Sequence, residues 1–185
     1  MSLITKYRPQ TFDEVLGQPG AVKALRTAIE GKRAQVFALS GPSGTGKTTL
    51  ARIAAKVAGC KPADLIEVDA ATNSGIDKMR EIQNMMLYRT VNGGPRAAII
   101  DEAHGLSKQS WDSLLKATEE PKAGALWFLC TTNVAKIPKT MLTRCARIDL
   151  KPVADAAIRK LVEQVADEEK LSIGDGAIDA VVSTA

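Results

Sequence analysis

The sequence predicts an α/β domain, in which a parallel, doubly wound sheet of five strands is flanked by helices, followed by the start of a small helical domain. Two observations lead to this fold class. Short apolar runs alternate along the chain with longer segments of helical spacing, as in strands joined by crossover helices. Two of the runs, at 97–100 and 126–131, show no polar alternation, which is typical of strands buried on both faces of a parallel sheet.

The predicted elements follow one another without an internal repeat. In the segment 48–58, Leu50, Ile53 and Val57 recur on one helical face. The helix at 107–119 ends before Pro121, because the residue before a proline disfavours the helical conformation. The strands are predicted at 35–39, 65–68, 97–100, 126–131 and 147–150, and the helices at 48–58, 77–87, 107–119, 155–169 and 176–185.

The composition changes at Lys151-Pro152, after which only helical patterns follow. We therefore predict an α/β domain at 1–150 and a helical domain at 151–185. The chain stops within the second helical pattern, so we expect the helical domain to be incomplete, as in a fragment of a longer protein.

Composition and charge set limits on the class of protein. Of the 185 residues, 45% are apolar and 25% are charged, and no apolar run approaches the roughly 18–20 residues that cross a bilayer. Residues 1–6 lack the charged and apolar segments of a signal peptide, so we expect a cytoplasmic protein with no membrane partner. The net charge of +4 suits contact with a polyanion, although a lysine-rich solvated surface explains it equally well.

The three cysteines, Cys60, Cys130 and Cys145, are widely spaced and form no Cys-x-x-Cys pair. Neither a zinc ribbon nor a disulfide framework is therefore indicated. Cys130 lies in an apolar run and is interpreted as a buried thiol.

A glycine-rich segment follows the first predicted strand and opens the first predicted helix. It fits GxxxxGK[ST] at every fixed position, in the strand–loop–helix context that the motif requires. Such a loop aims backbone N–H groups at phosphate oxygens, and the helix N-terminus favours the negative charge. Lys47 is expected to reach the β- and γ-phosphates of ATP, and Thr48 to place its hydroxyl on Mg²⁺. The predicted phosphate-binding residues are Gly41, Pro42, Ser43, Gly44, Thr45, Gly46, Lys47, Thr48 and Thr49.

The buried strand at 97–100 ends in two carboxylates, Asp101 and Glu102, which is the Walker B pattern. Asp101 is expected to hold Mg²⁺, and Glu102 to orient or deprotonate the attacking water. A capped helix start, where acidic residues are also favoured, is the alternative interpretation.

His104 is the only histidine and completes the letters DEAH, a helicase motif. Helicases of that type need a second domain that grips the nucleotide, and 185 residues cannot hold both. We interpret His104 as a structural hydrogen-bonding residue beside the site.

With these motifs in place, the chain resembles the AAA+ ATPases, and among them the clamp-loader subunits of the bacterial DNA polymerase III gamma/tau type and of replication factor C. The resemblance covers essentially the whole chain and is carried by the ordered set of segments 6–12, 15–18, 69–73, 114–121 and 131–133. It implies that the N-terminal segment wraps the adenine. The residues that this assigns to the nucleotide are Tyr7, Arg8, Pro9, Val15, Gly17 and Gln18.

The resemblance also implies that Asn133 is a sensor residue. It ends a buried strand beside Asp101, where an amide can hold the attacking water or a γ-phosphate oxygen; a turn-starting asparagine is the alternative. The family's Ser-Arg-Cys sequence appears here as Thr143-Arg144-Cys145. The resemblance implies that Arg144 acts in trans, on the ATP of a neighbouring subunit, and a plain surface arginine is the alternative.

One departure concerns zinc. Bacterial gamma/tau subunits usually carry a four-cysteine insertion between the first helix and the second strand, where this chain has a short segment with Cys60 alone. We therefore expect no zinc, and either a divergent form from a virus or mobile element or a branch nearer replication factor C. The sensor-2 arginine and the oligomerisation collar of the family also lie outside this sequence.

The resemblance predicts the ATPase motor of a clamp loader. Its partners would be other clamp-loader subunits in a ring or spiral, a sliding clamp and primed DNA. The alternatives are another AAA+ remodeller, such as a helicase loader or Holliday-junction motor, and a structural subunit that does not hydrolyse ATP. Helix N-termini are expected to meet DNA phosphates, with plain helix capping by Ser74 or Ser107 as the other interpretation. The candidates are Ser74 and Gly75 at one helix and Ser107, Lys108 and Gln109 at another.

Overall fold

A computed structural model describes residues 2–88, 90 and 93–184. Met1, the first residue of the predicted α/β domain, and Ala185, the last residue of the helix predicted at 176–185, lie outside the described residues.

The centre of the fold is a sheet of five strands, all parallel, in the order β2-β3-β4-β1-β5. This confirms the predicted fold class, and each strand agrees with its prediction to within one residue at either end. The boundaries of the strands at 36–40, 96–101 and 125–131 were predictable because buried parallel strands are continuous apolar runs that end where polar residues begin. The strands are β1 (Val36–Ser40), β2 (Leu65–Asp69), β3 (Arg96–Asp101), β4 (Ala125–Thr131) and β5 (Ala146–Asp149).

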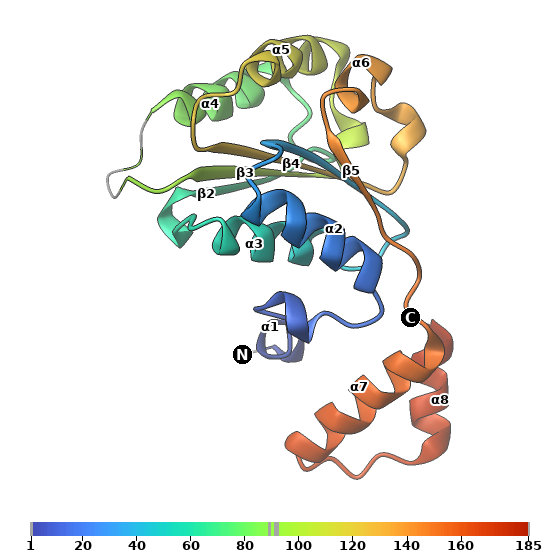
Figure 1. The fold of residues 1–185 in the computed structure, drawn as a ribbon. Coiled ribbons are helices and arrows are strands. Elements are labelled where there is room, and N and C mark those ends of the chain that lie inside the picture. Colours follow the sequence, from blue (N-terminus) through green and yellow to red (C-terminus); the bar gives the residue numbers. More distant parts are fainter. Residues whose placement is uncertain (1, 89, 91–92, 185) are drawn as a thin grey trace.

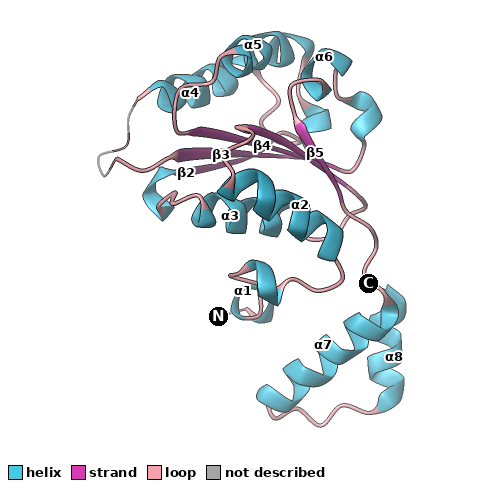
Figure 2. Ribbon diagram, viewed as in Figure 1, coloured by secondary structure: helices cyan, strands magenta, loops and turns pink. Residues whose placement is uncertain are grey.

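Two layers of helices enclose the sheet (Figures 1 and 2). One face is covered by α2 (Pro19–Glu30) and α3 (Lys47–Val57), and the other by α4 (Ile76–Leu87) and α5 (Lys108–Glu119). The short helices α1 (Leu3–Lys6) and α6 (Lys139–Leu142) complete this part of the chain. The α5 prediction was one residue too long at its start, because Ser107 is the N-cap and lies outside the helix.

Helix α2 was absent from the sequence predictions. Its signals are nevertheless present: Pro19 occupies the first turn, where a missing N–H costs nothing, and Ala21, Leu25 and Ile29 recur every four residues and are buried. The prediction for the N-terminal segment rests on family resemblance and does not use this periodicity.

The sheet has a separate hydrophobic core on each face. On the α2–α3 side, Phe37 and Phe128 stack with ring centroids 5.1 Å apart. On the α4–α5 side, Trp127 packs with Trp111 and Leu114. Because successive side chains of a strand point to opposite faces, β4 supplies its two adjacent aromatic residues to the two cores.

The cysteines are buried to different degrees. Cys130 is fully buried in β4, as predicted, and burial raises the pKa of its thiol far above the ordinary value. Burial also raises the pKa of the Cys145 thiol to about 11.

After β5 the chain continues into α7 (Asp155–Glu168) and α8 (Asp175–Thr184), which pack on each other and are joined by an ion pair between Arg159 and Asp179. Both helices lie within one residue of their predicted positions. Glu169, just after α7, accepts hydrogen bonds from Lys6 Nζ at 2.7 Å and from Tyr7 Oη at 2.9 Å, so the helical pair contacts the N-terminal segment. Among the described residues, no helix is both long enough and apolar enough to cross a membrane.

Leu25 tests the contribution of α2 to the fold. Its side chain is completely buried against the first core, so Leu25→Ala should lower the free energy of unfolding by about 2–5 kcal/mol, measured by urea denaturation. Leu87→Ala is the matched control, because Leu87 ends α4 with 57% of its surface exposed. Equal losses in the two variants would contradict the packing of α2.

Candidate functional site

The candidate site lies where the central strands end. Because all five strands are parallel, their carboxyl ends meet at one edge of the sheet, where ligands bind in α/β folds. Ser40 at the end of β1 pairs with Thr131 at the end of β4, and β3 lies on the other side of β4. The phosphate loop after β1, the carboxylates after β3 and the segment after β4 are therefore neighbours.

The loop between β1 and α3 has the form of a phosphate cradle. Gly44 and Gly46 have φ values of +78° and +93°, in the left-handed region that favours glycine, and a Cβ built on either would meet nothing within 4 Å. Gly41 is required for a different reason: a Cβ there would lie 2.6 Å from the carbonyl oxygen of Leu150. The open space over the two glycines fits a phosphate group.

The Lys47 side chain is hydrogen-bonded to the backbone of this loop. The side chain is 7% exposed, and Nζ donates to the carbonyl oxygens of Gly41 at 3.0 Å and Pro42 at 2.7 Å. Thr45 Oγ1 donates to the same Pro42 carbonyl at 2.9 Å. An ammonium group has three N–H donors, so Lys47 keeps one for an anion in the cradle.

Thr48 and Asp101 form the contact between the two motifs. Thr48 Oγ1 donates to Asp101 Oδ2 at 2.7 Å, and the other carboxylate oxygen accepts from the backbone N–H of Glu102 at 3.0 Å. Hydroxyl and carboxylate oxygens are the hard ligands that Mg²⁺ prefers beside phosphates. The residues present at this position therefore fit a magnesium ion.

Glu102 adopts a left-handed backbone conformation, with φ +45°. Its Oε2 atom accepts a hydrogen bond from Thr132 Oγ1 at 3.1 Å and lies 3.1 Å from Nδ1 of His104. The same Nδ1 lies 3.0 Å from Oγ1 of Thr131. His104 thus makes a hydrogen bond with Thr131 beside the site, as predicted.

Asn133 follows β4 at the N-cap of a 3₁₀ turn, Val134–Lys136. Its side chain makes no capping hydrogen bond and is exposed, while its backbone N–H donates to Thr131 Oγ1 at 3.0 Å. The amide is therefore not used by the turn, and the sensor role stays a prediction.

The N-terminal segment meets the site through Gln18. The buried side chain donates from Nε2 to the Lys151 carbonyl at 2.6 Å and, more weakly, to that of Thr45 at 3.4 Å, and its Oε1 accepts from the Lys151 N–H at 3.2 Å. Val15 packs against the first core, and a Cβ on Gly17 would lie 2.9 Å from Val153. These residues connect the phosphate loop to the segment that leads into α7.

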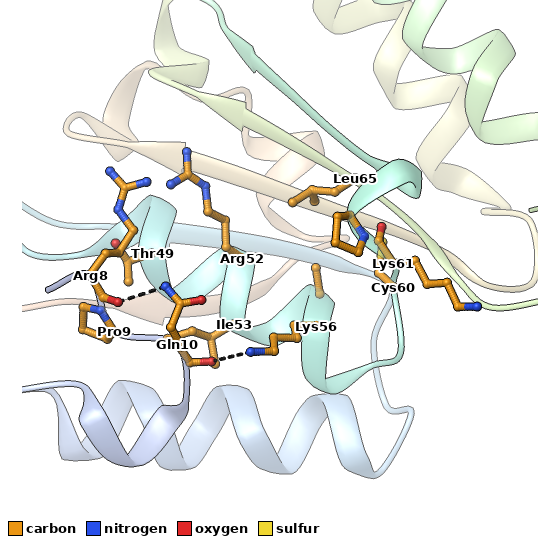
Figure 3. A pocket seen from close by; sticks show the side chains of 12 residues that line it. Arg8, Pro9, Gln10, Thr49, Arg52, Ile53, Lys56, Cys60, Lys61 and Leu65 are labelled. Atoms are coloured by element: carbon orange, nitrogen blue, oxygen red, sulfur yellow. Dashed lines mark hydrogen bonds between the residues drawn. The ribbon is translucent and has the colours of Figure 1, made fainter. Parts of the chain in front are cut away.

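Three of the predicted nucleotide residues, Arg8, Pro9 and Thr49, line one hollow of about 270 Å³ (Figure 3). Arg52 and Lys56 of α3 lie beside them; Lys56 Nζ donates to the Gln10 carbonyl at 3.4 Å. Arg8 and Arg52 extend the same way in this view, and the Arg52 guanidinium is paired with the carboxylate of Glu67.

The hydrogen bonds of the Arg144 side chain go to α5 and α6 and not to the phosphate loop. The guanidinium donates to Glu119 Oε1 at 2.7 Å and to the Thr140 carbonyl at 2.8 Å, which belong to α5 and α6. The ion pair is exposed, with 32% of the Arg144 side chain accessible, so solvent screens it and it contributes little to stability.

One carbonyl group joins the two helix starts that are predicted to contact DNA. The Ser74 carbonyl accepts from Ser110 Oγ at 2.8 Å and from the Ser107 N–H at 3.3 Å, which joins the starts of α4 and α5. The Ser107 side chain caps α5, as the helix-capping interpretation predicts. The N-cap of α4 is Gly75 and not Ser74. Lys108 and Gln109 are exposed in the first turn of α5.

Several contacts at the site were not predicted from the sequence. Glu119, which holds Arg144, and the pair Thr131 and Thr132, which contact His104 and Glu102, were seen only as parts of longer resembling segments. No local pattern signals them, because each partner is distant along the chain.

Comparisons with known proteins agree with this geometry. A family model described as "DNA polymerase III, delta subunit" matches residues 61–154, just over half of the chain, and one described as "Magnesium chelatase, subunit ChlI" matches residues 11–95. Among solved structures, the RuvB Holliday junction branch migration motor of Thermotoga maritima superposes with a TM-score of 0.77 at 23% identity, over 95% of this chain and 59% of that one. At that identity the likeness establishes the fold.

Several relatives of higher identity are subunits of DNA polymerase III. The chain is 34% identical to subunit tau of Bacillus subtilis over 100% of its own length and 37% of the relative. It is 35% identical to subunit gamma of Buchnera aphidicola subsp. Baizongia pistaciae, over 92% of its length and 52% of the relative. The chain thus spans about a third to a half of these proteins. It belongs to the AAA+ clamp-loader family of DNA polymerase III subunits.

Proposed function

We propose that this chain is the ATP-binding and ATP-hydrolysing motor of a clamp loader, which places a sliding clamp on primed DNA. One observation carries the proposal most directly: the Thr48–Asp101 hydrogen bond of 2.7 Å sets the phosphate loop against the Walker B carboxylates. Phosphoryl transfer needs mainly positioning and charge neutralisation, and this edge of the sheet supplies both.

Each residue has a defined task in the proposed reaction. Lys47 neutralises phosphate charge, and Thr48 with Asp101 would hold Mg²⁺, which supplies further charge neutralisation when bound. Glu102 orients the attacking water, and Asn133 contacts that water or the γ-phosphate. Arg144 completes the site of a neighbouring subunit, where its planar guanidinium spreads positive charge over the transferred group.

The assembly is part of the proposal. The partners would be further clamp-loader subunits in a ring or spiral, the clamp and primed DNA, in the cytoplasm. Residues 151–185, which begin at the segment held by Gln18, would be the start of a lid domain whose position depends on the nucleotide.

Two other functions are less well supported. A Holliday-junction motor shares the fold, but the RuvB likeness is at 21–23% identity, below the 32–35% of the DNA polymerase III relatives. A scaffold that does not hydrolyse ATP would not need Lys47, Asp101 and Glu102 together at one edge.

Nucleotide binding is tested at Lys47. Lys47→Ala should abolish measurable ATP binding in calorimetry, because its ammonium balances the phosphate charge. Lys23→Ala, an exposed lysine of α2, should bind as the unaltered protein does. Equal affinities for Lys47→Ala and Lys23→Ala would reject the phosphate-loop assignment.

The trans role of Arg144 is tested in the assembled full-length protein. Arg144→Ala should leave ATP affinity unchanged and reduce turnover by on the order of 10³-fold or more, as for arginines supplied in trans elsewhere. Arg147→Ala, an exposed arginine of β5, should have little effect.

Mixing variants sharpens this test. Combining Glu102→Gln subunits with Arg144→Ala subunits should restore turnover only at interfaces that pair an intact Glu102 with an intact Arg144. An equal loss in Arg144→Ala when measured on a verified monomer would rule out action between subunits.

DNA contact is tested at Lys108, in the first turn of α5. Lys108→Ala should weaken DNA binding equally for all sequences and reduce the slope of log affinity against log salt by about 0.9. Lys23→Ala is the control of equal charge. An unchanged slope would remove Lys108 from the DNA surface.

A further inference from the structure

The imidazole of His104 lies between the Walker B glutamate and the end of β4. Its Nδ1 atom is 3.1 Å from Glu102 Oε2 and 3.0 Å from Thr131 Oγ1. Thr131 Oγ1 in turn accepts from the backbone N–H of Asn133 at 3.0 Å. One ring nitrogen therefore connects Glu102 to the segment that positions Asn133.

The hydrogen atoms in this contact can be assigned from the partners. A carboxylate only accepts, so a bare Nδ1 would set its lone pair against Glu102 Oε2 at 3.1 Å. Hydrogen on Nδ1 replaces this repulsion by attraction between the N–H group and the carboxylate, and Thr131 Oγ1 then accepts the hydrogen bond from Nδ1. Thr132 Oγ1 donates a hydrogen bond to Oε2 at 3.1 Å. Within the described residues, Oε1 of Glu102 has no hydrogen-bond partner, which leaves that oxygen for water.

The backbone around His104 is well suited to hold the ring. Glu102 is in the left-handed region, which costs about 1–2 kcal/mol for a residue with a side chain, and the 3₁₀ turn Ala103–Gly105 follows at once. Ala103 is completely buried, and a Cβ on Gly105 would lie 3.1 Å from the Ala70 carbonyl, so this turn sits firmly against the end of β2. The turn brings His104 back over the side chain of Glu102.

We infer that His104 is a positioning residue for ATP hydrolysis: it fixes the Glu102 carboxylate and keeps it at a set distance from Asn133. This rests on the proposed ATPase function. His104 touches neither ATP nor the attacking water; it acts through Glu102. Its loss should therefore lower turnover without changing nucleotide affinity, since the side-chain hydrogen bonds described for Lys47, Thr48 and Asp101 do not involve it.

The test measures kcat and KM for ATP in the assembled full-length protein. His104→Ala and His104→Leu remove the donor, and both should reduce kcat by roughly 10- to 100-fold, the effect of misplacing a catalytic group by about an ångström, with KM within about twofold. His104→Asn keeps an N–H donor near the position of Nδ1 and should recover most of the activity. Leucine is the control for ring volume.

A double variant separates positioning from general damage. In the Glu102→Gln background, His104→Ala should cause no further loss, because the group it positions is already disabled. Wild-type kcat in His104→Ala, equal activity of the leucine and asparagine variants, or a further loss in the double variant would each overturn the inference. The proposed function fails separately, and this inference with it, if Glu102→Gln hydrolyses ATP as fast as the wild type.

Discussion

The parallel pairing of β1 with the central strand, β4, determines where the parts of the site lie. Strand β1 pairs in parallel with β4 on one side and β5 on the other, and β3 pairs with β4. Since parallel strands end at the same edge, the loop that leaves β1 emerges two strands from Asp101, close enough for Thr48 to bridge the gap. A strand order that placed β1 farther from β3 would separate the phosphate loop from the carboxylates, and no change of side chains would bring them together.

The two cores make this arrangement rigid. Helices α2 and α3 press on one face and α4 and α5 on the other, and the aromatic pair Trp127 and Phe128 connects both cores to β4. That strand then continues into Thr131, Thr132 and Asn133. Residues that position the reacting groups therefore lie on an element packed from both sides, whereas Arg144 and Lys108, which would face partners, lie at exposed positions.

The sequence was sufficient for the elements and the motifs but not for the contacts between them. Buried strands and the GxxxxGK[ST] loop are local patterns, so their positions could be predicted closely. Helix α2 also has a local pattern, with Leu25 and Ile29 on its inner face. The prediction for this segment rests on family resemblance and does not use that pattern. The contacts of Glu102 with Thr132 and of Arg144 with Glu119 join residues 30 and 25 positions apart. They follow from strand order and turn geometry, which no local pattern contains.

The hydrogen bonds of Gln18 restrict which residues can occupy its position. Its amide accepts from the Lys151 N–H while donating to the Lys151 and Thr45 carbonyls, all in a buried setting. A glutamate of the same length would turn an oxygen toward two carbonyl oxygens, and a leucine would leave three backbone groups unsatisfied. Asparagine is too short by one methylene to reach both sides. Variation in related sequences should therefore be strongly restricted here, even though the side chain carries no charge and performs no chemistry.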